Sequence, residues 1–405
     1  MNLDEKLDYL MQGTEYGDPS IAESMAQELR ERLIESEKTG IPLKVYCGYD
    51  PTSSDLHLGH TVSMRKLRQF QELGHDVTFV IGTFTSLIGD PSGRDKSRPL
   101  ISREKVLENA RTYAEQAFRV LDREKTKIAY NDEWLSQVTL AEILSVATNF
   151  TAQQILAREG FHKRMEANDP IYLHEFLYPI SQGLDAHHLE TDVQVGGTDQ
   201  LYNIVTASRK VMTSYGQRPN IGILMPLLPG TDGEQKMSKS LGNYIPIHTT
   251  AEDMYGKVMS LPDKAMVIYS KLVTQWKPAK ITAFEAGLES GHLHPRDAKM
   301  QLAWEITNAF YGPESATAAQ EQFVAMFQKG SAPEEMPEYV TDGNETLVDI
   351  MVGNGLAESK SQARRLIDQQ GVKVDGITMR DGSTVVDRPG IIQVGKRHYL
   401  KVVTK

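Results

Sequence analysis

Two histidines three residues apart follow a short polar loop, and their spacing is the first sign of chemistry in the sequence. The stretch CGYDPTSSDLHLGH, residues 47–60, runs through Pro, Thr, Ser and Asp to His57 and His60. A helix that begins there places both rings on one side of its first turn. The unpaired N–H groups and the positive end of the helix dipole point the same way, which is typical of an anion site. Gly59 leaves room for a flat ring against the backbone.

The histidine pair alone is also compatible with a solvated helix start or with a metal site. Zinc needs further ligands, and neither the single cysteine, Cys47, nor another suitably spaced histidine supplies them. Two further histidine pairs, at residues 187–188 and 292–294, have neighbours without ligand spacing, so we expect them at surfaces or helix ends. The sequence therefore predicts no metal ligands.

A second charged cluster is the stretch GEQKMSKSLGN, residues 233–243. Lys236 and Lys239 alternate with serines between glycines, directly after the last run with strand character. This composition suits a mobile cationic loop that closes on a leaving pyrophosphate. It is not a P-loop, because the pattern G-x-x-x-x-G-K-[ST] is absent. A solvated charge run is the alternative, but the order of the two motifs within one fold favours a phosphate site.

Both motifs lie where short apolar runs alternate with helical periodicity. We expect strands at residues 43–49, 76–82, 126–130, 192–195 and 221–226, with helices between them. One helix is predicted over residues 20–40, with a capping box from Ser20 to Glu23, and another over residues 102–121. This alternation predicts an α/β fold with a Rossmann-like parallel sheet, whose ligands bind at the carboxyl ends of the strands.

The rest of the chain changes character twice. Residues 248–330 show helical periodicity only, and we expect an all-helical domain there, after a catalytic domain of residues 1–247. Residues 331–346 are rich in Gly, Pro and acidic residues without periodicity, which predicts a linker. Residues 347–405 then favour two short helices and a β hairpin, which would make a small α+β domain.

Composition narrows the class of protein further. The chain has 405 residues, more than one ordinary core, with 40% hydrophobic and 7% aromatic residues. No apolar run approaches the roughly 18 residues of a membrane span, and the acidic start MNLDEKLDYL is unlike a signal peptide. We therefore expect a cytoplasmic protein with no membrane partner. The net charge of −10 argues against a general grip on nucleic acid, but residues 341–405 hold ten Lys/Arg against eight Asp/Glu.

The two motifs together resemble the HIGH and KMSKS signatures of the class I aminoacyl-tRNA synthetases. The first differs only by Leu58 in place of Ile, and the second matches at every position. Four more stretches, YCGYDPT, SLIGDPSGR, YPISQGLD and VGGTDQLYNI, are similar to the tyrosine and adenylate pocket of bacterial-type tyrosyl-tRNA synthetases. The resemblance covers essentially the whole chain. It implies that L-tyrosine is activated with ATP and transferred to tRNA(Tyr).

The resemblance implies a role for each matching residue. Around tyrosine, it places Tyr46 and Asp185 at the phenol, Asp90, Tyr178 and Gln182 at the ammonium, and Gln200 near the carboxylate. Along the nucleotide, it places Cys47, Gly48, Asp50, Gly59, Gly197, Asp199 and Lys239. The catalytic residues that it implies are Thr52, His57, His60, Lys236 and Lys239, with Mg²⁺ expected beside the ATP. Spacings of four and three also put Tyr178, Gln182 and Asp185 on one helix face.

The tail, from GLAESKSQARRLIDQQGVKVDG onward, resembles the S-four-like RNA-binding domain of a ribosomal small-subunit protein. Ser359, Lys360, Ser361, Arg364 and Arg365 cluster at the start of a predicted helix, where they would position phosphates. We expect Lys360, Arg364 and Arg365 to contact RNA, and a solvated helix is the alternative. The family also implies a homodimer, and no DNA partner is expected.

Three other functions share part of this pattern. A tryptophanyl enzyme carries both signatures but has no reason for a pair of Tyr46 and Asp185. Adenylate-forming nucleotidyltransferases such as pantothenate synthetase have related histidine and lysine motifs but no RNA-binding tail. A synthetase-derived RNA-binding protein without catalysis would not need both signatures intact.

Overall fold

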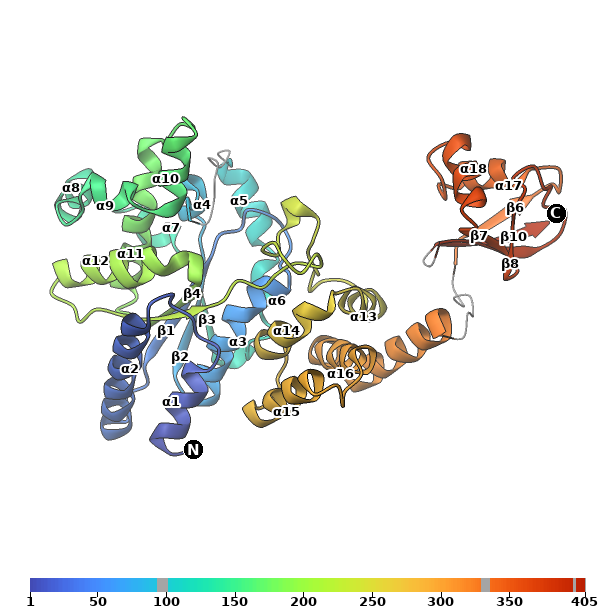
Figure 1. Ribbon diagram of the computed structural model, residues 1–405. Helices are drawn as coiled ribbons and strands as arrows, with labels where there is room; N and C mark the ends of the chain where they lie inside the picture. Colours follow the sequence, from blue (N-terminus) through green and yellow to red (C-terminus); the bar gives the residue numbers. More distant parts are fainter. Residues whose placement is uncertain (93–100, 329–335, 396–397, 405) are drawn as a thin grey trace. The chain divides into compact units, whose positions relative to one another are not determined.

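The computed structural model describes residues 1–92, 101–328, 336–395 and 398–404. They belong to two compact units, residues 1–312 and residues 313–405, and each is considered by itself (Figure 1). Two predicted features, the last two residues of SLIGDPSGR and residues 331–335 of the linker, lie outside the described residues. Within the described part of the chain, no helix has the length and apolar character that a membrane crossing requires.

A parallel five-stranded sheet forms the centre of the first unit. Its order is β3-β2-β1-β4-β5, and its strands are β1 Lys44–Tyr49, β2 Asp76–Ile81, β3 Thr126–Tyr130, β4 Val193–Gly197 and β5 Ile221–Met225. The predicted strands agree with these bounds to within two residues at each end. The chain proceeds from β1 to one side and returns to the other side at β4, so ligands are expected at the carboxyl ends of β1 and β4.

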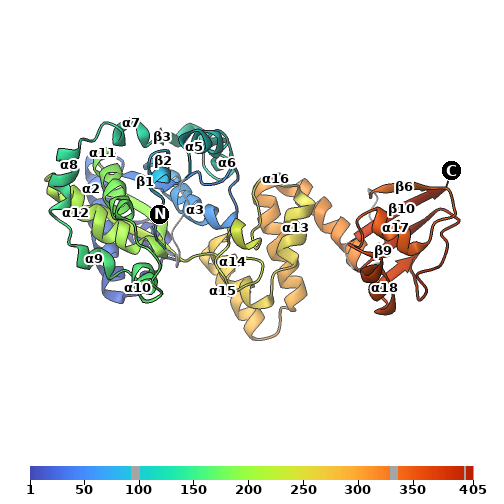
Figure 2. The same cartoon turned by 90° about the horizontal axis from the view of Figure 1, so that it is seen from above.

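Helices cover both faces of this sheet (Figures 1 and 2). The helices nearest the centre are α1 Leu3–Met11, α2 Pro19–Thr39, α3 Leu58–Glu72, α11 Leu177–His188 and α12 Arg209–Ser214. Tyr46 of β1 packs with Ala186 of α11 and Met212 of α12. Tyr49 faces the opposite side, where its hydroxyl lies 2.7 Å from the hydroxyl of Ser63 on α3. The two tyrosines differ in direction because side chains alternate along a strand.

The helix α2 begins at Pro19, one residue before the start of the predicted range at Ser20. Asp18, not Ser20, is the N-cap, and its carboxylate accepts the N–H of Ser20 at 2.8 Å. Pro19 occupies the first helical position, where its missing N–H costs no hydrogen bond. The predicted capping box of Ser20 and Glu23 is therefore wrong, because the Asp-Pro pair before it caps the helix better.

The predicted helix over residues 102–121 is two helices, α5 Arg103–Ala110 and α6 Tyr113–Ala117. The break coincides with contacts to the loop before the histidine pair. Thr112 Oγ1 and Gln116 Nε2 donate to the carbonyl of Ser54 at 2.9 and 2.8 Å, and Gln116 Oε1 accepts the N–H of Leu56 at 2.7 Å. These tertiary hydrogen bonds anchor the loop and override the helical periodicity of the segment.

Shorter helices complete the first unit. Beside the sheet they are α4 Thr85–Ile88, η1 Arg123–Lys125, α7 Asp132–Leu135, α8 Leu140–Ala147, α9 Ala152–Leu156, α10 Glu159–Glu166, η2 Leu173–Phe176, η3 Thr198–Gln200, the π-helix η4 Tyr202–Ser208 and η5 Lys239–Leu241. The helical part contains α13 Ala251–Met259, η6 Asp263–Ala265, α14 Met266–Leu272, α15 Pro278–Glu289 and the start of α16 Pro295–Gln328. Arg119 lies 4.9 Å from the ring centre of Tyr311 and joins these two parts.

The two units divide at an interruption of α16. Gly312 has a φ of 82° and a ψ of 166°, which no helix accommodates, and Pro313 follows it without an N–H to donate. The described elements of residues 251–328 are all helical, as the periodicity predicted. The predicted boundary at residue 247 lies inside the first unit, and the domain limits remain predictions.

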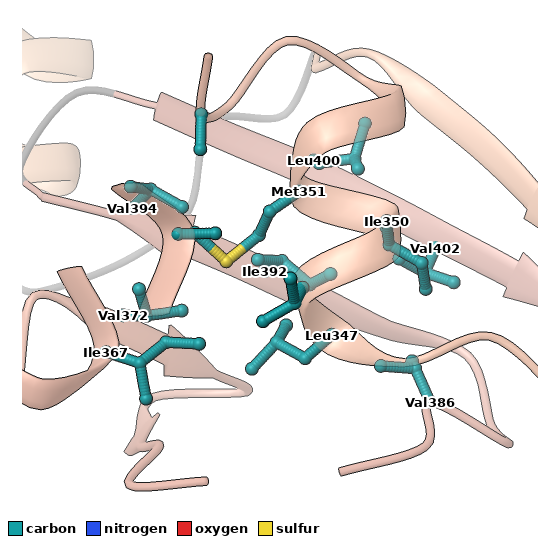
Figure 3. Close-up of a cluster of buried hydrophobic side chains, with 13 residues drawn as sticks. Leu347, Ile350, Met351, Ile367, Val372, Val386, Ile392, Val394, Leu400 and Val402 are labelled. Atoms are coloured by element: carbon teal, nitrogen blue, oxygen red, sulfur yellow. The ribbon is translucent and has the colours of Figure 1, made fainter. Parts of the chain in front are cut away.

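The second unit carries a five-stranded mixed sheet of order β6-β10-β9-β7-β8. Its elements are β6 Glu338–Thr341, α17 Leu347–Gly353, α18 Lys360–Asp368, β7 Val372–Val374, β8 Ile377–Thr378, β9 Gly390–Val394 and β10 His398–Thr404. Figure 3 shows its core, where Leu347 and Met351 of α17 pack with Ile367 of α18 and with Ile392 and Val402 of the sheet.

The strand β6 was not predicted, because it lies in the range expected to be linker. Its residues pair in parallel with β10, with Tyr339 opposite Val402. A four-residue strand at the edge of a sheet has too few residues for its alternation to stand out. The partner strand at the end of the chain supplies the hydrogen bonds that define it.

Candidate active site

The carboxyl ends of β1 and β4 open into two neighbouring cavities of the first unit. The inner cavity, of about 220 Å³, is lined by all the residues predicted to hold tyrosine: Tyr46, Asp90, Tyr178, Gln182, Asp185 and Gln200. The outer cavity, of about 640 Å³, is lined by the predicted catalytic residues Thr52, His57, His60, Lys236 and Lys239. Thr52, His60, Asp90 and Gly197 line both, so the two cavities adjoin.

The predicted nucleotide residues are divided between these cavities. Cys47, Gly48 and Asp50 line the inner cavity, and Gly59 and Asp199 line the outer one. A Cβ on Gly48 would meet no described atom within 4 Å, so its backbone is open to a ligand. A Cβ on Gly59 would lie 3.0 Å from the ring of His57, so glycine at this position leaves room for that ring beside the outer cavity.

A buried carboxylate and a buried phenol lie at one end of the inner cavity. Asp185 is 4% exposed and accepts hydrogen bonds from Trp134 Nε1 at 2.8 Å and from Asn131 Nδ2 at 3.2 Å. Burial raises the pKa of Asp185 to about 8, and these two donors oppose the rise. The Tyr46 hydroxyl donates to the Gln182 carbonyl at 3.3 Å, and burial followed by the Asp185 charge raises the pKa of Tyr46. The pair can therefore exchange hydrogen bonds with a ligand hydroxyl.

Asn131 and Trp134 were missed by the sequence analysis. Asn131 follows β3 directly and Trp134 belongs to α7, so both stand at the carboxyl edge of a strand that the sequence did predict. Because ligands bind at the carboxyl ends of parallel strands, the position of Asn131 directly after β3 could have indicated a site residue. Nothing in the local sequence indicates that the Trp134 indole reaches Asp185.

Acceptors gather on another wall of the inner cavity. The Asp90 carboxylate accepts from Gln200 Nε2 at 2.8 Å and from the Ser92 N–H at 2.9 Å. Gln182 Oε1 is buried and has no hydrogen-bond partner among the described residues, a costly state unless a ligand donates to it. An ammonium group has three donors and suits such a wall. Tyr178, predicted at the same place, lines the same cavity, and its hydroxyl donates to Asp50 Oδ2 at 3.0 Å.

A hydrogen-bond network that the sequence analysis missed orients Ser92 and Gln200, the two residues that donate to Asp90. Ser92 Oγ accepts from Arg158 Nη2 at 2.6 Å and from Asn203 Nδ2 at 3.1 Å. Asn203 Nδ2 also donates to Gln200 Oε1 at 2.9 Å, which orients the amide that contacts Asp90. Ser92 and Asn203 lie within stretches that resemble the family, whereas Arg158 belongs to no motif. The network fixes the orientation of the acceptors before a ligand arrives.

The two histidines meet at the start of α3, as their spacing predicted. His57 is the N-cap, its N–H donates to His60 Nδ1 at 3.1 Å, and the ring centres are 3.9 Å apart. Burial, with Lys236 and Lys239 nearby, lowers the pKa of His60 to about 4, and burial likewise lowers the pKa of His57. Both rings are therefore neutral at physiological pH. His57 Nδ1 is buried beside the outer cavity, and no group in the described ranges of the chain bonds to it.

The two lysines of the second motif approach the outer cavity from a loop between β5 and α13. Lys236 Nζ lies 2.7 Å from Asp199 Oδ2, and Lys239 Nζ lies 3.0 Å from Asp55 Oδ2. The Lys236 side chain is 48% exposed and that of Lys239 is 23% exposed. Both cations line the outer cavity and are paired with a carboxylate, so an anionic ligand in the cavity can compete for them.

The second unit has its own candidate surface. A groove of about 380 Å³ is lined by Lys360 and Arg364 and also by Arg380, which the sequence analysis missed. Lys360 Nζ lies 2.7 Å from Asp349 Oδ1, and Arg365 is not among the described residues that line the groove. Arg380 stands in the loop after β8, so only the tertiary fold brings it to the helix α18.

Comparisons with known proteins show the family to which the chain belongs. A model described as "tRNA synthetases class I (W and Y)" matches residues 38–328, and one described as "Tyrosine--tRNA ligase SYY-like C-terminal domain" matches residues 328–402. The tyrosine–tRNA ligase of Moorella thermoacetica is 47% identical over 95% of this chain and 94% of its own length. That of Thermotoga maritima is 45% identical over 92% and 93%. The chain belongs to the tyrosine–tRNA ligases. The resemblance seen in the sequence is confirmed, and this aminoacyl-tRNA synthetase is assigned to tyrosine and not to tryptophan.

Solved structures support the fold of this tyrosine–tRNA ligase. A C-terminally truncated mitochondrial tyrosyl-tRNA synthetase of Aspergillus nidulans has a TM-score of 0.63 at 23% identity, covering 80% of this chain and 94% of its own. The tyrosyl-tRNA synthetase of Archaeoglobus fulgidus, solved with L-tyrosine, has a TM-score of 0.61 at 23% identity, covering 79% and 100%. The predicted α/β class is thereby confirmed.

We predict that Asp185→Asn changes how stability varies with pH. The raised pKa, from 3.8 to about 8, means that folded Asp185 keeps a proton which the unfolded chain has lost. The free energy of unfolding of the wild type should therefore fall between about pH 4 and pH 8, by at most about 1.4 kcal/mol per pH unit. The neutral amide lacks this dependence, although its mismatch with Asn131 and Trp134 adds a constant loss. The free energy of unfolding of the variant should therefore increase relative to that of the wild type as pH rises.

Denaturant unfolding followed by tryptophan fluorescence measures this difference, because Trp134, Trp276 and Trp304 all belong to the first unit. A difference between variant and wild type that stays constant from about pH 4 to pH 8 would contradict the prediction.

Proposed function

We propose that the inner cavity binds L-tyrosine and that the outer cavity holds the phosphates of ATP. This proposal rests on one observation about the inner cavity. At one end, Tyr46 and Asp185 can form hydrogen bonds with a ligand hydroxyl, and on another wall Asp90 and Gln182 offer acceptors. These two groups of partners suit the phenol and the ammonium of the same amino acid. The tyrosine carboxylate then attacks the α-phosphorus of ATP in line, pyrophosphate leaves, and the tyrosyl group passes to the 3′ end of tRNA(Tyr).

In this mechanism the protein forms no covalent bond with substrate. Its contribution is to position the two reactants and to stabilise negative charge on the phosphates. The neutral rings of His57 and His60 serve as N–H donors at the start of α3, with Thr52 on the same cavity wall. Lys236 and Lys239 bring positive charge from the loop on the other side. The adenylate itself would lie along Cys47, Gly48, Asp50, Gly197 and Asp199.

Mg²⁺ is proposed to bind together with the phosphates of ATP. Mg²⁺ usually binds through substrate phosphates and one or two carboxylates, and it neutralises charge on the leaving group. Asp199 is a carboxylate that lines the outer cavity and fits this role. The protein is further proposed to act in the cytoplasm, where its tRNA partner is found.

Exchange between ATP and pyrophosphate, measured with each proteinogenic amino acid, tests the proposed activity. Tyrosine should support exchange, and phenylalanine should fail, because its ring displaces water from Tyr46 and Asp185 without offering a hydroxyl to either of them. Exchange driven by tryptophan or by no amino acid at all would overturn the assignment of the inner cavity.

We predict that Lys236→Ala and Lys239→Ala slow adenylate formation and leave tyrosine affinity nearly unchanged. The lysines act on charge that grows in the transition state, so their loss should raise the barrier by about 2–4 kcal/mol each. Stopped-flow measurement of the single-turnover rate, with tyrosine binding measured in parallel, checks this. Lys271→Ala, an exposed lysine paired with Glu285 on the helical part, serves as the matched control. Rates equal to the wild type in both loop variants would remove the loop from the mechanism.

We propose that the second unit binds tRNA through the groove of Lys360 and Arg364. The combined variant Lys360→Glu and Arg364→Glu should still form tyrosyl-adenylate but charge tRNA with a raised KM. Each lost phosphate contact should also reduce the salt dependence of tRNA binding by about one unit of log slope. Lys373→Glu, an exposed charge reversal on β7, is the control. Unchanged charging by the double variant would exclude this groove as the RNA surface.

We propose that the protein is a homodimer formed through an apolar face of the first unit. Leu140 and Leu144 of α8 are 74% and 61% exposed, and Leu173 of η2 is 81% exposed. Both views place α8, α9 and α10 along the same end of this unit (Figures 1 and 2). Several large apolar side chains left in water are typical of an interaction surface.

Leu140→Asp combined with Leu144→Asp should therefore yield monomers in sedimentation velocity at concentrations where the wild type is dimeric. Ile377→Asp is the control, because Ile377 is 66% exposed but lies in the second unit. A double variant that still sediments as a dimer would place the interface elsewhere.

A further inference from the structure

One side chain of the lysine loop is buried although the loop around it is exposed. Asn243, four residues after Lys239, is only 5% exposed. Its Oδ1 accepts the Ser238 N–H at 2.8 Å, and its Nδ2 donates to Asp232 Oδ2 at 2.5 Å. The same Nδ2 also lies 3.4 Å from the Gln235 carbonyl. The amide orientation is fixed by chemistry, because a carboxylate needs a donor and a backbone N–H needs an acceptor.

Residues 228–237 of the loop form a short hairpin around this amide. The Gly230 N–H donates to the Gln235 carbonyl at 2.7 Å, and the Met237 N–H donates to the Leu228 carbonyl at 2.8 Å, which together form a short hairpin. A Cβ on Gly230 would lie 2.3 Å from Asn243 Cγ. Glycine is therefore required at residue 230 for the amide to enter the hairpin.

Asp232 connects the tip of the hairpin to Asn243. Its Oδ1 accepts the N–H groups of Glu234 and Gln235, each at 2.8 Å, and its Oδ2 accepts the Asn243 amide. The hydrogen bond from the Asn243 side chain, followed by the one from the Glu234 N–H, lowers the pKa of Asp232. The carboxylate is thus an acceptor on both oxygens and ties the turn to the amide.

Between these hydrogen bonds, the backbone of the lysine loop is held at two points. The Lys236 carbonyl lies 3.3 Å from Asn243 Nδ2, and Ser238 donates its N–H to the same amide, so the backbone on both sides of Met237 is fixed. Met237 itself is 2% exposed and anchors the loop on the apolar side. The Lys236 side chain, in contrast, is about half exposed and is paired with Asp199 outside the hairpin.

We propose that Asn243 and Asp232 form a clasp that sets the backbone shape of the lysine loop and thereby presents Lys236 to the outer cavity. Neither residue is among the described residues that line the two cavities, so they are positioning residues and not catalytic ones. This inference rests on the proposed role of the lysines in adenylate formation. It adds that the loop carries its own internal scaffold, separate from the carboxylates that pair with the lysines.

The decisive experiment reverses the hydrogen bond of the clasp. Asn243→Asp alone brings two carboxylates together, which should open the hairpin and displace Lys236. We expect the single-turnover rate of adenylate formation to fall about 10- to 100-fold, the loss that a displacement of about 1 Å can cause. Tyrosine binding should stay at the wild-type value, because the inner cavity lies outside the loop.

Adding Asp232→Asn to this variant restores a donor and an acceptor in exchanged positions. The amide introduced at position 232 can donate to the carboxylate introduced at position 243, and that carboxylate can still accept the Ser238 N–H. A carboxylate at position 243 cannot donate to the Gln235 and Lys236 carbonyls, so the double variant should recover part of the lost rate and not all of it. The two substitutions should still be strongly non-additive. A merely structural role would not produce recovery of the rate with unchanged tyrosine binding.

Two more variants keep the test conclusive. Gly230→Ala pushes on Asn243 without a change of charge, so it should slow the same step even if Asn243→Asp does not fold. Asn168→Asp makes the same chemical change at an exposed residue with a φ of 53° and should leave the rate unchanged. Lys236→Ala is measured beside them. A slow Lys236→Ala with a normal Asn243→Asp, or a double variant without recovery, would overturn the clasp alone. A normal Lys236→Ala would overturn the proposed role of the loop itself.

Discussion

The burial of one carboxylate, Asp185, is the constraint on which the inner cavity depends. A carboxylate that is 4% exposed is costly unless its oxygens find donors. Trp134 Nε1 and Asn131 Nδ2 supply these donors, one from α7 and one from the end of β3. The sheet, the helix α11 and the segment after β3 must therefore keep their mutual positions, and Tyr46 on β1 packs into the same cluster. The closed end of the cavity is rigid because several elements together supply the hydrogen bonds of one buried carboxyl group.

The outer cavity, in contrast, combines a fixed wall with positively charged side chains that are partly exposed. Its fixed wall is the start of α3, where burial keeps His57 and His60 neutral by lowering the pKa of each ring. Its positive charge comes from a loop whose backbone is braced from inside while its lysine side chains remain partly exposed. An amino acid with a defined shape suits a rigid pocket. In the proposed function a triphosphate enters the outer cavity and a pyrophosphate leaves it, which suits a wall whose lysine side chains can change partner.

The sequence predicted this arrangement wherever local pattern determined structure. The strands β4 and β5 are almost entirely buried, and the other strands of the first sheet are short β-rich runs, so their existence was evident. The spacing of His57 and His60 followed from the helix. Long-range contacts were not accessible. The break between α5 and α6 depends on the carbonyl of Ser54, and β6 exists because β10 pairs with it. Most pocket residues were found through resemblance to a family, whereas Arg158 and Trp134 act through contacts that no motif encodes.

The ion pairs of the lysines explain how the loop can be ordered and still be ready to move. Lys236 and Lys239 are paired with Asp199 and Asp55, and in each pair at least one side chain is about half exposed. Ion pairs at the surface contribute about 0–1 kcal/mol, although Asp199 is only 12% exposed and its pair with Lys236 is less open to water. In the proposed function, a lysine that moves from its carboxylate to a phosphate exchanges one charge-assisted hydrogen bond for another, so the lost bond is replaced. In this proposal the carboxylates keep the lysines near the cavity until a phosphate replaces them. The internal bracing by Asn243 keeps the loop backbone in place while that exchange happens.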